Sequence, residues 1–117
     1  MPTDQKIDYL ELPASEFDAV QGFYESAFGW SFTDYGPDYR AFTDGNIDGG
    51  FYKSELMSST NNGAVLVILF ANQLEHTRER VISCGGTIVR DIFSFPGGRR
   101  FHFADPHGNE LAVWSDK

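Results

Sequence analysis

Residues 15–29 read SEFDAVQGFYESAFG, and residues 72–86 read NQLEHTRERVISCGG. Each stretch begins with a residue that favours helix N-termini, Ser15 or Asn72, carries an acidic residue three positions later, and ends in glycine. The first stretch also repeats apolar residues at the spacing of one helix face: Phe17, Val20, Phe23, Tyr24, Ala27 and Phe28. Because Ser15 and Asn72 are 57 positions apart, as are Gly29 and Gly86, the two stretches predict helices at equivalent places in a repeated unit.

Strand-like segments surround both predicted helices in the same order. One segment precedes each helix and three follow it, at residues 6–13, 30–33, 39–43 and 49–53, and again at 64–70, 87–91, 100–104 and 110–114. A polar stretch between the two sets, residues 54–63, predicts a linker. The chain is therefore predicted to be one α+β domain over residues 1–117, with βαβββ module 1 at about 6–53 and module 2 at about 64–115.

Composition narrows the possible partners. The 117 residues include 9 basic and 17 acidic side chains, a net charge of -8, which disfavours binding to nucleic-acid phosphates or anionic lipid. The single cysteine, Cys84, excludes an internal disulfide and suits a reducing compartment. The polar N-terminus has no signal-peptide pattern, and the longest apolar run, residues 64–71, is too short to span a bilayer. We therefore expect a cytoplasmic protein without nucleic-acid or membrane partners.

Several motifs resemble one known group of proteins. They are the FY pair and the FGW triplet within residues 10–32, GG at 85–86, PGGR at 96–99 and FADPHGN at 103–109. In these the chain resembles the vicinal oxygen chelate superfamily, which includes glyoxalase I, extradiol dioxygenases, and bleomycin- and fosfomycin-resistance proteins. The resemblance implies two βαβββ modules that curve as half-barrels around a concave pocket, and a homodimer. It does not fix the reaction, because this fold serves many chemistries.

The resemblance also implies where a metal ion would be held. In metal-using relatives, His, Glu or Gln ligands lie on the first and last strand of each module. Counting from the motifs puts Tyr9, Gly49, Leu66 and Ala112 at these positions. Leucine, glycine and alanine side chains cannot coordinate a divalent ion. We therefore expect no metal cofactor, and a relocated site of His102, Glu11 and Glu110 is the alternative.

Strand alternation divides the remaining residues between a core face and a pocket face. Phe101, Phe103, Leu111 and Val113 are predicted to pack against the helices. The predicted ligand-binding residues are Tyr9, Glu11, Phe51, Leu66, Arg100, His102, Glu110 and Trp114. A planar ligand can stack between Phe51 and Trp114, and Arg100 can bind a carboxylate or phosphate. Alternatively, the two aromatic residues lie in a dimer interface, and Arg100 pairs with a glutamate.

Three hypotheses for function follow. The first is a metal-free protein that binds a small organic molecule in an aromatic-lined pocket. The second is a lyase or isomerase of the glyoxalase type, which uses a relocated metal ion, or His102 as a general base beside Glu11 or Glu110. The third is an interaction module whose sheet serves dimerisation. The sequence does not name a ligand or decide whether the protein is an enzyme.

Overall fold

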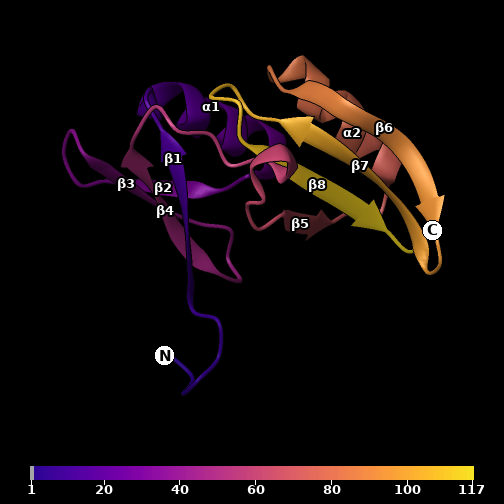
Figure 1. The fold of residues 1–117 in the computed structure, drawn as a ribbon, viewed down its shortest axis with the longest axis horizontal. Coiled ribbons are helices and arrows are strands. Elements are labelled where there is room, and N and C mark those ends of the chain that lie inside the picture. The colour runs from indigo at the N-terminus through magenta and orange to yellow at the C-terminus, as the bar shows by residue number, and fades with distance from the viewer. Residues whose placement is uncertain (1) are drawn as a thin grey trace. The chain divides into compact units, whose positions relative to one another are not determined.

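A computed structural model describes residues 2–117 of the chain, shown in Figure 1. The chain divides into two compact units, unit 1 at Met1–Leu56 and unit 2 at Met57–Lys117. Each unit contains a four-stranded mixed sheet and one α-helix in the order βαβββ, so the fold is α+β as expected. No helix within residues 2–117 has the length and apolar content needed to cross a membrane.

Unit 1 is built around sheet A, whose strand order is β1-β4-β3-β2. Strands β1 and β4 are parallel, and the other neighbours are antiparallel. The elements of this unit are β1 (Tyr9–Ala14), α1 (Phe17–Phe28), β2 (Ser31–Asp34), β3 (Tyr39–Thr43) and β4 (Asp48–Lys53).

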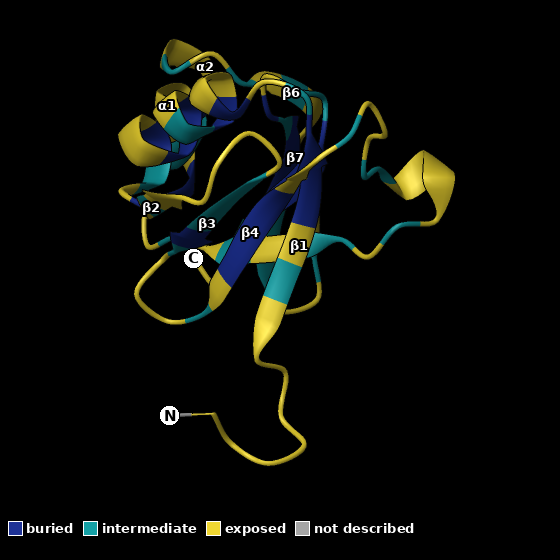
Figure 2. Cartoon of the chain, turned by 90° about the vertical axis from the view of Figure 1, so that its left-hand side faces the viewer, coloured by how far each residue is buried: buried dark blue, intermediate teal, exposed yellow. Residues whose placement is uncertain are grey.

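Helix α1 covers one face of sheet A and closes an aromatic core. The ring of Tyr24 stacks on Trp30, with 4.3 Å between centroids, and Trp30 stacks on Phe42 at 4.6 Å. Tyr24 also contacts Phe51 of β4, at 5.8 Å. The strand β4 is buried along its middle, as Figure 2 shows. The predicted apolar stripe is confirmed for its buried members Phe17, Val20, Phe23, Tyr24 and Ala27, while Phe28 is half-buried.

Both predicted helix starts are wrong by one residue. The N-cap residues are Glu16 and Gln73, not Ser15 and Asn72, and neither makes a side-chain cap hydrogen bond. In each unit, a backbone group next to the expected helix start is still bonded to a residue of a neighbouring strand. The Ser15 carbonyl accepts a hydrogen bond from Lys53 Nζ, and the backbone N–H of Ala71 donates to Trp114. The predicted stop at Gly29 is confirmed, because its φ of 73° places it in the left-handed region.

Unit 2 is built around sheet B, whose strand order is β5-β8-β7-β6, with β5 and β8 parallel. Its elements are a short 3-10 helix η1 (Thr60–Asn62), β5 (Val67–Phe70), α2 (Leu74–Ser83), β6 (Thr87–Phe95), β7 (Gly98–Ala104) and β8 (Glu110–Ser115). The strands predicted at residues 87–91 and 100–104 extend further toward each other than expected. Strands β6 and β7 form a hairpin in which only Pro96 and Gly97 lie between them.

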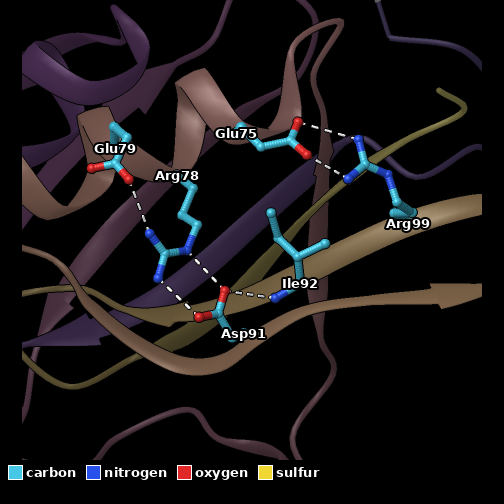
Figure 3. Close-up of polar contacts among 6 residues, drawn as sticks. All are labelled: Glu75, Arg78, Glu79, Asp91, Ile92 and Arg99. Carbon is cyan, nitrogen blue, oxygen red and sulfur yellow. Dashed lines mark hydrogen bonds and ion pairs between the residues drawn. The ribbon is translucent and has the colours of Figure 1, made fainter.

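Helix α2 packs on the face of sheet B formed by Phe101, Phe103, Leu111 and Val113, all fully buried, as alternation predicted. Ion pairs connect the helix to the sheet (Figure 3). Glu75 pairs with Arg99 of β7, and Arg78 makes two hydrogen bonds of 2.8 and 2.9 Å to Asp91 of β6. These pairs hold the polar surface of the helix against the strands, while Leu74 and Val81 supply its buried contacts.

The predicted linker is partly folded into unit 2. The backbone N–H of Ser58 donates to Asn109 Oδ1 at 2.9 Å, and the N–H of Glu110 donates to the Ser58 carbonyl at 2.8 Å. The side chain of Asn62 donates to the Met57 carbonyl. Residues 57–63 are therefore fixed to the start of β8 and help to form the site around Glu110.

Candidate functional site

The predicted site residues lie on the face of each sheet that points away from its helix, which we call the distal face. Tyr9 and Glu11 are on the distal face of sheet A. The other predicted site residues share the distal face of sheet B: Arg100, His102, Glu110 and Trp114. Arg100 pairs with Trp114, and His102 pairs with Ala112, in the ladder of β7 and β8. Glu110 lies two positions before Ala112 and therefore faces the same side.

Phe51 is an exception, and its predicted place in the pocket is wrong. In the parallel pairing of β1 and β4, Phe51 lies beside Leu12 and Gly49 beside Leu10, so both share the core face. Phe51 is 0% exposed and packs against Tyr24 of α1 and Phe42 of β3. It therefore cannot form a ligand sandwich with Trp114.

Leu66 lies just before β5 and is half-buried, and Ile68 is the residue that pairs with Ala112.

A chain of hydroxyl groups crosses the distal face of sheet A. Tyr39 donates its hydroxyl proton to Glu11 Oε2 over 3.0 Å, and the Tyr9 and Tyr39 hydroxyl oxygens are 2.6 Å apart. Because the single Tyr39 proton goes to Glu11, Tyr9 is the donor to Tyr39. Burial, and then the hydrogen bonds with Tyr9 and Glu11, raise the pKa of Tyr39 far above its usual value. Tyr39 is therefore a neutral phenol at physiological pH.

The sequence reasoning missed Tyr39, although a signal was present. Side chains alternate between the two faces of a strand, so Tyr39 and the core residue Phe42 of residues 39–43 point to opposite faces of the sheet. Tyr39 therefore shares the distal face with Tyr9. The structure shows what allows this position. An ideal Cβ at Gly50 would lie 2.0 Å from the Tyr39 hydroxyl oxygen, so the tyrosine side chain occupies the space that a larger residue on β4 would fill.

The same face is hollowed into an open groove of about 570 Å³. Tyr9 and Tyr39 line it together with the hydroxyl groups of Ser31, Thr33 and Thr43 and the carboxylate of Asp48. Its ten lining residues include no lysine, arginine or histidine. The volume suits a small organic molecule, and the lining favours a neutral or cationic one. We call this site the tyrosine groove.

On the distal face of sheet B, His102 and Glu110 form a buried pair. His102 Nδ1 lies 2.7 Å from Glu110 Oε2, and the side chains are 7% and 9% exposed. Thr60 donates both its N–H and its hydroxyl to the other oxygen, at 3.0 and 2.9 Å. This arrangement confirms the expected proximity of His102 to Glu110. The sequence did not indicate the part played by Thr60.

The hydrogen bonds set the protonation of the pair. Burial acts to raise the pKa of Glu110, but the bonds from the Thr60 N–H, His102 and the Thr60 hydroxyl outweigh it, so the pKa falls below its usual value. An ionised Glu110 accepts the proton of His102 Nδ1. Among residues 2–117, no hydrogen-bond partner reaches the buried Nε2 of His102. In a neutral imidazole this Nε2 carries the basic lone pair.

Arg100 does not pair with a glutamate, since Glu110 is engaged by His102 and Thr60. Instead its guanidinium lies over the rings of Phe93 and Phe95, at 5.3 and 5.8 Å from their centroids. Trp114, its cross-strand neighbour, contacts Phe95 at 6.3 Å and Phe70 edge-on at 5.2 Å. These four aromatic residues and Arg100 form an aromatic wall.

Irregular pairing of β6 helps to form this wall. The register of β6 against β7 shifts twice, between Ile88 and Arg90 and between Arg90 and Phe93. As a result Arg90 lies opposite His102 and Phe93 opposite Arg100, so both belong to the distal face. Arg90 lies 3.6 Å from the centroid of the Phe93 ring.

The residues at the expected ligand positions do not fit a four-ligand metal site. The count that selected Gly49 is off by one, because Gly49 faces the core, and the distal residues of β4 at this level are Asp48 and Gly50. Leu66 and Ala112, on the other module, have no donor atoms in their side chains. No group of three or more His, Cys, Asp or Glu side chains that could hold a metal ion occurs within the described residues 2–117.

Comparison with known proteins identifies a family that the chain matches. Residues 6–113 match the family model described as the Glyoxalase/Bleomycin resistance protein/Dioxygenase superfamily. No curated protein matches the chain significantly in sequence.

Similar solved structures share the fold at low sequence identity. A glyoxalase-related enzyme from Fulvimarina pelagi is 17% identical, with a TM-score of 0.78 over 95% of this chain and 88% of that one. Lactoylglutathione lyase from Agrobacterium tumefaciens is 20% identical, with a TM-score of 0.71 over 97% and 96%. Fosfomycin resistance protein FosX from Mesorhizobium loti is 14% identical, with a TM-score of 0.75 over 97% and 93%. The chain belongs to the glyoxalase/bleomycin resistance protein/dioxygenase superfamily.

Proposed function

We propose that this protein binds a small organic molecule in the tyrosine groove, without a metal ion at the positions that metal-using relatives employ. The observation that carries the proposal is the hydrogen-bonded chain from Tyr9 through Tyr39 to Glu11, whose two tyrosines line a groove of about 570 Å³. Its aromatic rings offer stacking surfaces, and its hydroxyl groups offer directed hydrogen bonds. This combination is typical of sites that bind small molecules.

The charge of the groove defines the ligand class. Asp48 lines the groove, and Glu11 ends the hydroxyl chain, while none of the lining residues is basic. A protonated amine or a neutral hydrogen-bonding molecule avoids repulsion from these carboxylates, whereas an anion does not. An aromatic amine such as a phenethylamine therefore suits the groove better than an aromatic acid of the same size.

A thermal-shift and calorimetry screen tests the proposal. The probes are phenethylamine, its neutral alcohol analogue 2-phenylethanol, and phenylacetate. We expect the amine and the alcohol to raise the melting temperature, since a ligand that binds only the native state stabilises it. Tyr39→Phe removes the central hydroxyl and keeps the ring, and should weaken binding by about tenfold, the effect of one lost hydrogen bond. Tyr52 pairs with Tyr39 across β3 and β4 but does not line the groove, so Tyr52→Phe should leave binding unchanged.

Two results would count against this function. One is a screen in which none of the probes stabilises the protein at millimolar concentration. The other is binding that persists unaltered in Tyr39→Phe.

The pair of His102 and Glu110 favours a second candidate function, proton transfer in a lyase or isomerase. The 2.7 Å contact orients the imidazole so that Nδ1 carries a proton and Nε2 can accept one. Glu110 holds the ring and stabilises the imidazolium that forms, which is the role of the carboxylate in dyads of this kind. The name of the Agrobacterium relative suggests lactoylglutathione as the first compound to test.

The experiment compares matched variants in that assay. If His102 is the base, His102→Gln abolishes turnover, and Glu110→Gln lowers kcat and shifts the pH profile, because the imidazole loses its partner. His76→Gln, a histidine of α2, is the control and should retain full activity. Turnover that survives His102→Gln would exclude this mechanism.

A further inference from the structure

The aromatic wall on sheet B contains a cation without a counterion. Arg40, Arg78 and Arg99 each form an ion pair with a carboxylate. No carboxylate pairs with Arg100 among residues 2–117, and its Nε is buried without a hydrogen-bond partner there. In a chain with a net charge of -8, a half-buried guanidinium that lacks a carboxylate is unusual, because burial of an unpaired charge is costly. Such a group suits a site whose anion comes from outside the chain.

The position of Arg100 defines what it can bind. The guanidinium of Arg100 lies over the rings of Phe93 and Phe95, at 5.3 and 5.8 Å from their centroids. A guanidinium edge pairs with a planar carboxylate through two parallel hydrogen bonds. Arg90, which lies over Phe93, adds a second positive charge to the same face. The charge of this face is therefore opposite to that of the tyrosine groove.

Aromatic side chains extend from Arg100 across the strands. Trp114 lies directly opposite Arg100 in the ladder and contacts Phe95 and Phe70. Phe70 is 50% exposed and Trp114 is half-buried, so both retain surface for contact with a ligand. A molecule whose carboxylate binds Arg100 can place a flat apolar body against these rings. A free inorganic anion can bind Arg100 but has no flat apolar body to contact the aromatic rings.

We propose that the aromatic wall formed by Phe70, Phe93, Phe95, Arg100 and Trp114 binds a planar aromatic carboxylate, with the carboxylate paired to Arg100 and the ring stacked beside Trp114. This site is independent of the tyrosine groove and takes ligands of opposite charge. It therefore goes beyond the proposed function, and each can fail without the other.

Titration calorimetry with matched probes tests the proposal. The probes are 2-naphthoate, its neutral counterpart 2-naphthamide, and inorganic phosphate. We expect 2-naphthoate to bind at least about tenfold more tightly than either of the others, because only it satisfies both the fork and the rings. Binding should weaken with added salt, as expected for a partly exposed ion pair.

Variants assign the binding to this wall. Arg100→Gln should lose at least about tenfold in affinity, and Arg100→Lys should lose an intermediate amount because it keeps the charge but not the fork. Arg80→Gln removes the same charge from the exposed last turn of α2 and should bind as the parent does.

Tryptophan fluorescence gives a second readout that does not depend on the Arg100 variants. Trp30 is 6% exposed in the core of unit 1, so a ligand on sheet B should change the emission of Trp114, and Trp114→Phe should abolish that change. Equal affinity for 2-naphthoate and 2-naphthamide, full binding by folded Arg100→Gln, or no binding at millimolar concentration would overturn the proposal.

Discussion

Glu110 is a buried charged residue of unit 2 whose hydrogen bonds connect three elements. It accepts two hydrogen bonds from Thr60 and one from His102, and its side chain is only 9% exposed. The carboxylate thereby fixes η1 and the strand β7 to the start of β8. Because its pKa is lowered in the native state, this stabilisation depends on pH.

Glu110→Gln should lower the free energy of unfolding at pH 7 by about 2 kcal/mol, since buried hydrogen bonds to a charged group are lost. A carboxyl with a lowered native pKa contributes its full stability above its unfolded pKa, which is about 4.3 for glutamate. That contribution disappears as the pH falls through the native value. The difference between parent and variant should therefore shrink as urea titrations move from pH 7 to pH 3. Exposed Glu55→Gln is the control, and a difference that is constant with pH would contradict the assignment.

Gly50 and Tyr39 are coupled through the space they share. A Cβ at position 50 meets the Tyr39 hydroxyl at 2.0 Å, so Gly50→Ala must displace the tyrosine and break its bond to Glu11. We expect a loss of about 1 kcal/mol, the value of such a hydrogen bond. A double-mutant cycle measures it. In a Tyr39→Ala background the Gly50→Ala change should cost much less, and equal costs in both backgrounds would show that the two positions are independent.

At the scale of elements, glycine has opposite roles in α1 and in the hairpin of β6 and β7. Gly22 lies in the exposed part of α1, and a Cβ there meets nothing within 4 Å. A Cβ at Gly98 would lie 2.0 Å from the Ser115 carbonyl oxygen, on the backbone of β8. Gly22 therefore weakens α1, whereas the hairpin of β6 and β7 requires glycine at position 98.

Gly22→Ala should therefore raise the free energy of unfolding by about 0.5 to 1 kcal/mol, because alanine loses less backbone entropy in a helix. Gly98→Ala should lower it by at least about 1 to 3 kcal/mol, since backbone atoms of β8 have to move. Chemical denaturation of the two variants beside the parent measures both effects. The same sign for both would refute this account of the hairpin.

The elements were the most predictable level of the structure. Apolar periodicity identified α1 and its buried face, and alternation identified the buried face of β7 and β8, because both strands run without irregularity. The helix starts were missed because Ser15 and Asn72 have side chains that favour N-caps, but the Ser15 carbonyl and the Ala71 N–H are still bonded to residues of β4 and β8, and each helix begins one residue later than expected. The full lengths of β6 and β7 were missed because residues 94–99 resemble a loop, although only Pro96 and Gly97 lie between the two strands.

The site was less predictable because a shift of one residue exchanges the two faces of a strand. Phe51 was assigned to the wrong face since nothing in residues 47–53 fixes their register against β1. Phe93, Phe95 and Arg90 were missed because the irregular pairing of β6 moves side chains between faces, and no sequence pattern announces it. Alternation could have placed Tyr39 on the distal face, but its position over Gly50 depends on the pairing of β3 with β4.

For the whole molecule, the resemblance to the superfamily implies a homodimer. We expect light scattering to give about twice the 13.1 kDa of one chain. Exposed apolar residues support this expectation, since Val65 is 82% and Ile68 44% exposed. Val65→Lys should shift the equilibrium toward the monomer if these residues are in the interface, and Val89→Lys, on β6, is the control. A monomeric mass at high micromolar concentration would exclude the homodimer.

The irregular pairing of β6 has a consequence for solubility. This strand is nine residues long and lies at the end of sheet B, where its outer N–H and C=O groups have no strand neighbour in the sheet. A regular strand of that length is a template onto which another chain can add, which is how many proteins begin to aggregate. The two register shifts disturb the even spacing of these groups, and Arg90 and Asp91 add charge at the same place. The feature that brings Arg90 and Phe93 to one face thus also protects the protein from self-association through β6.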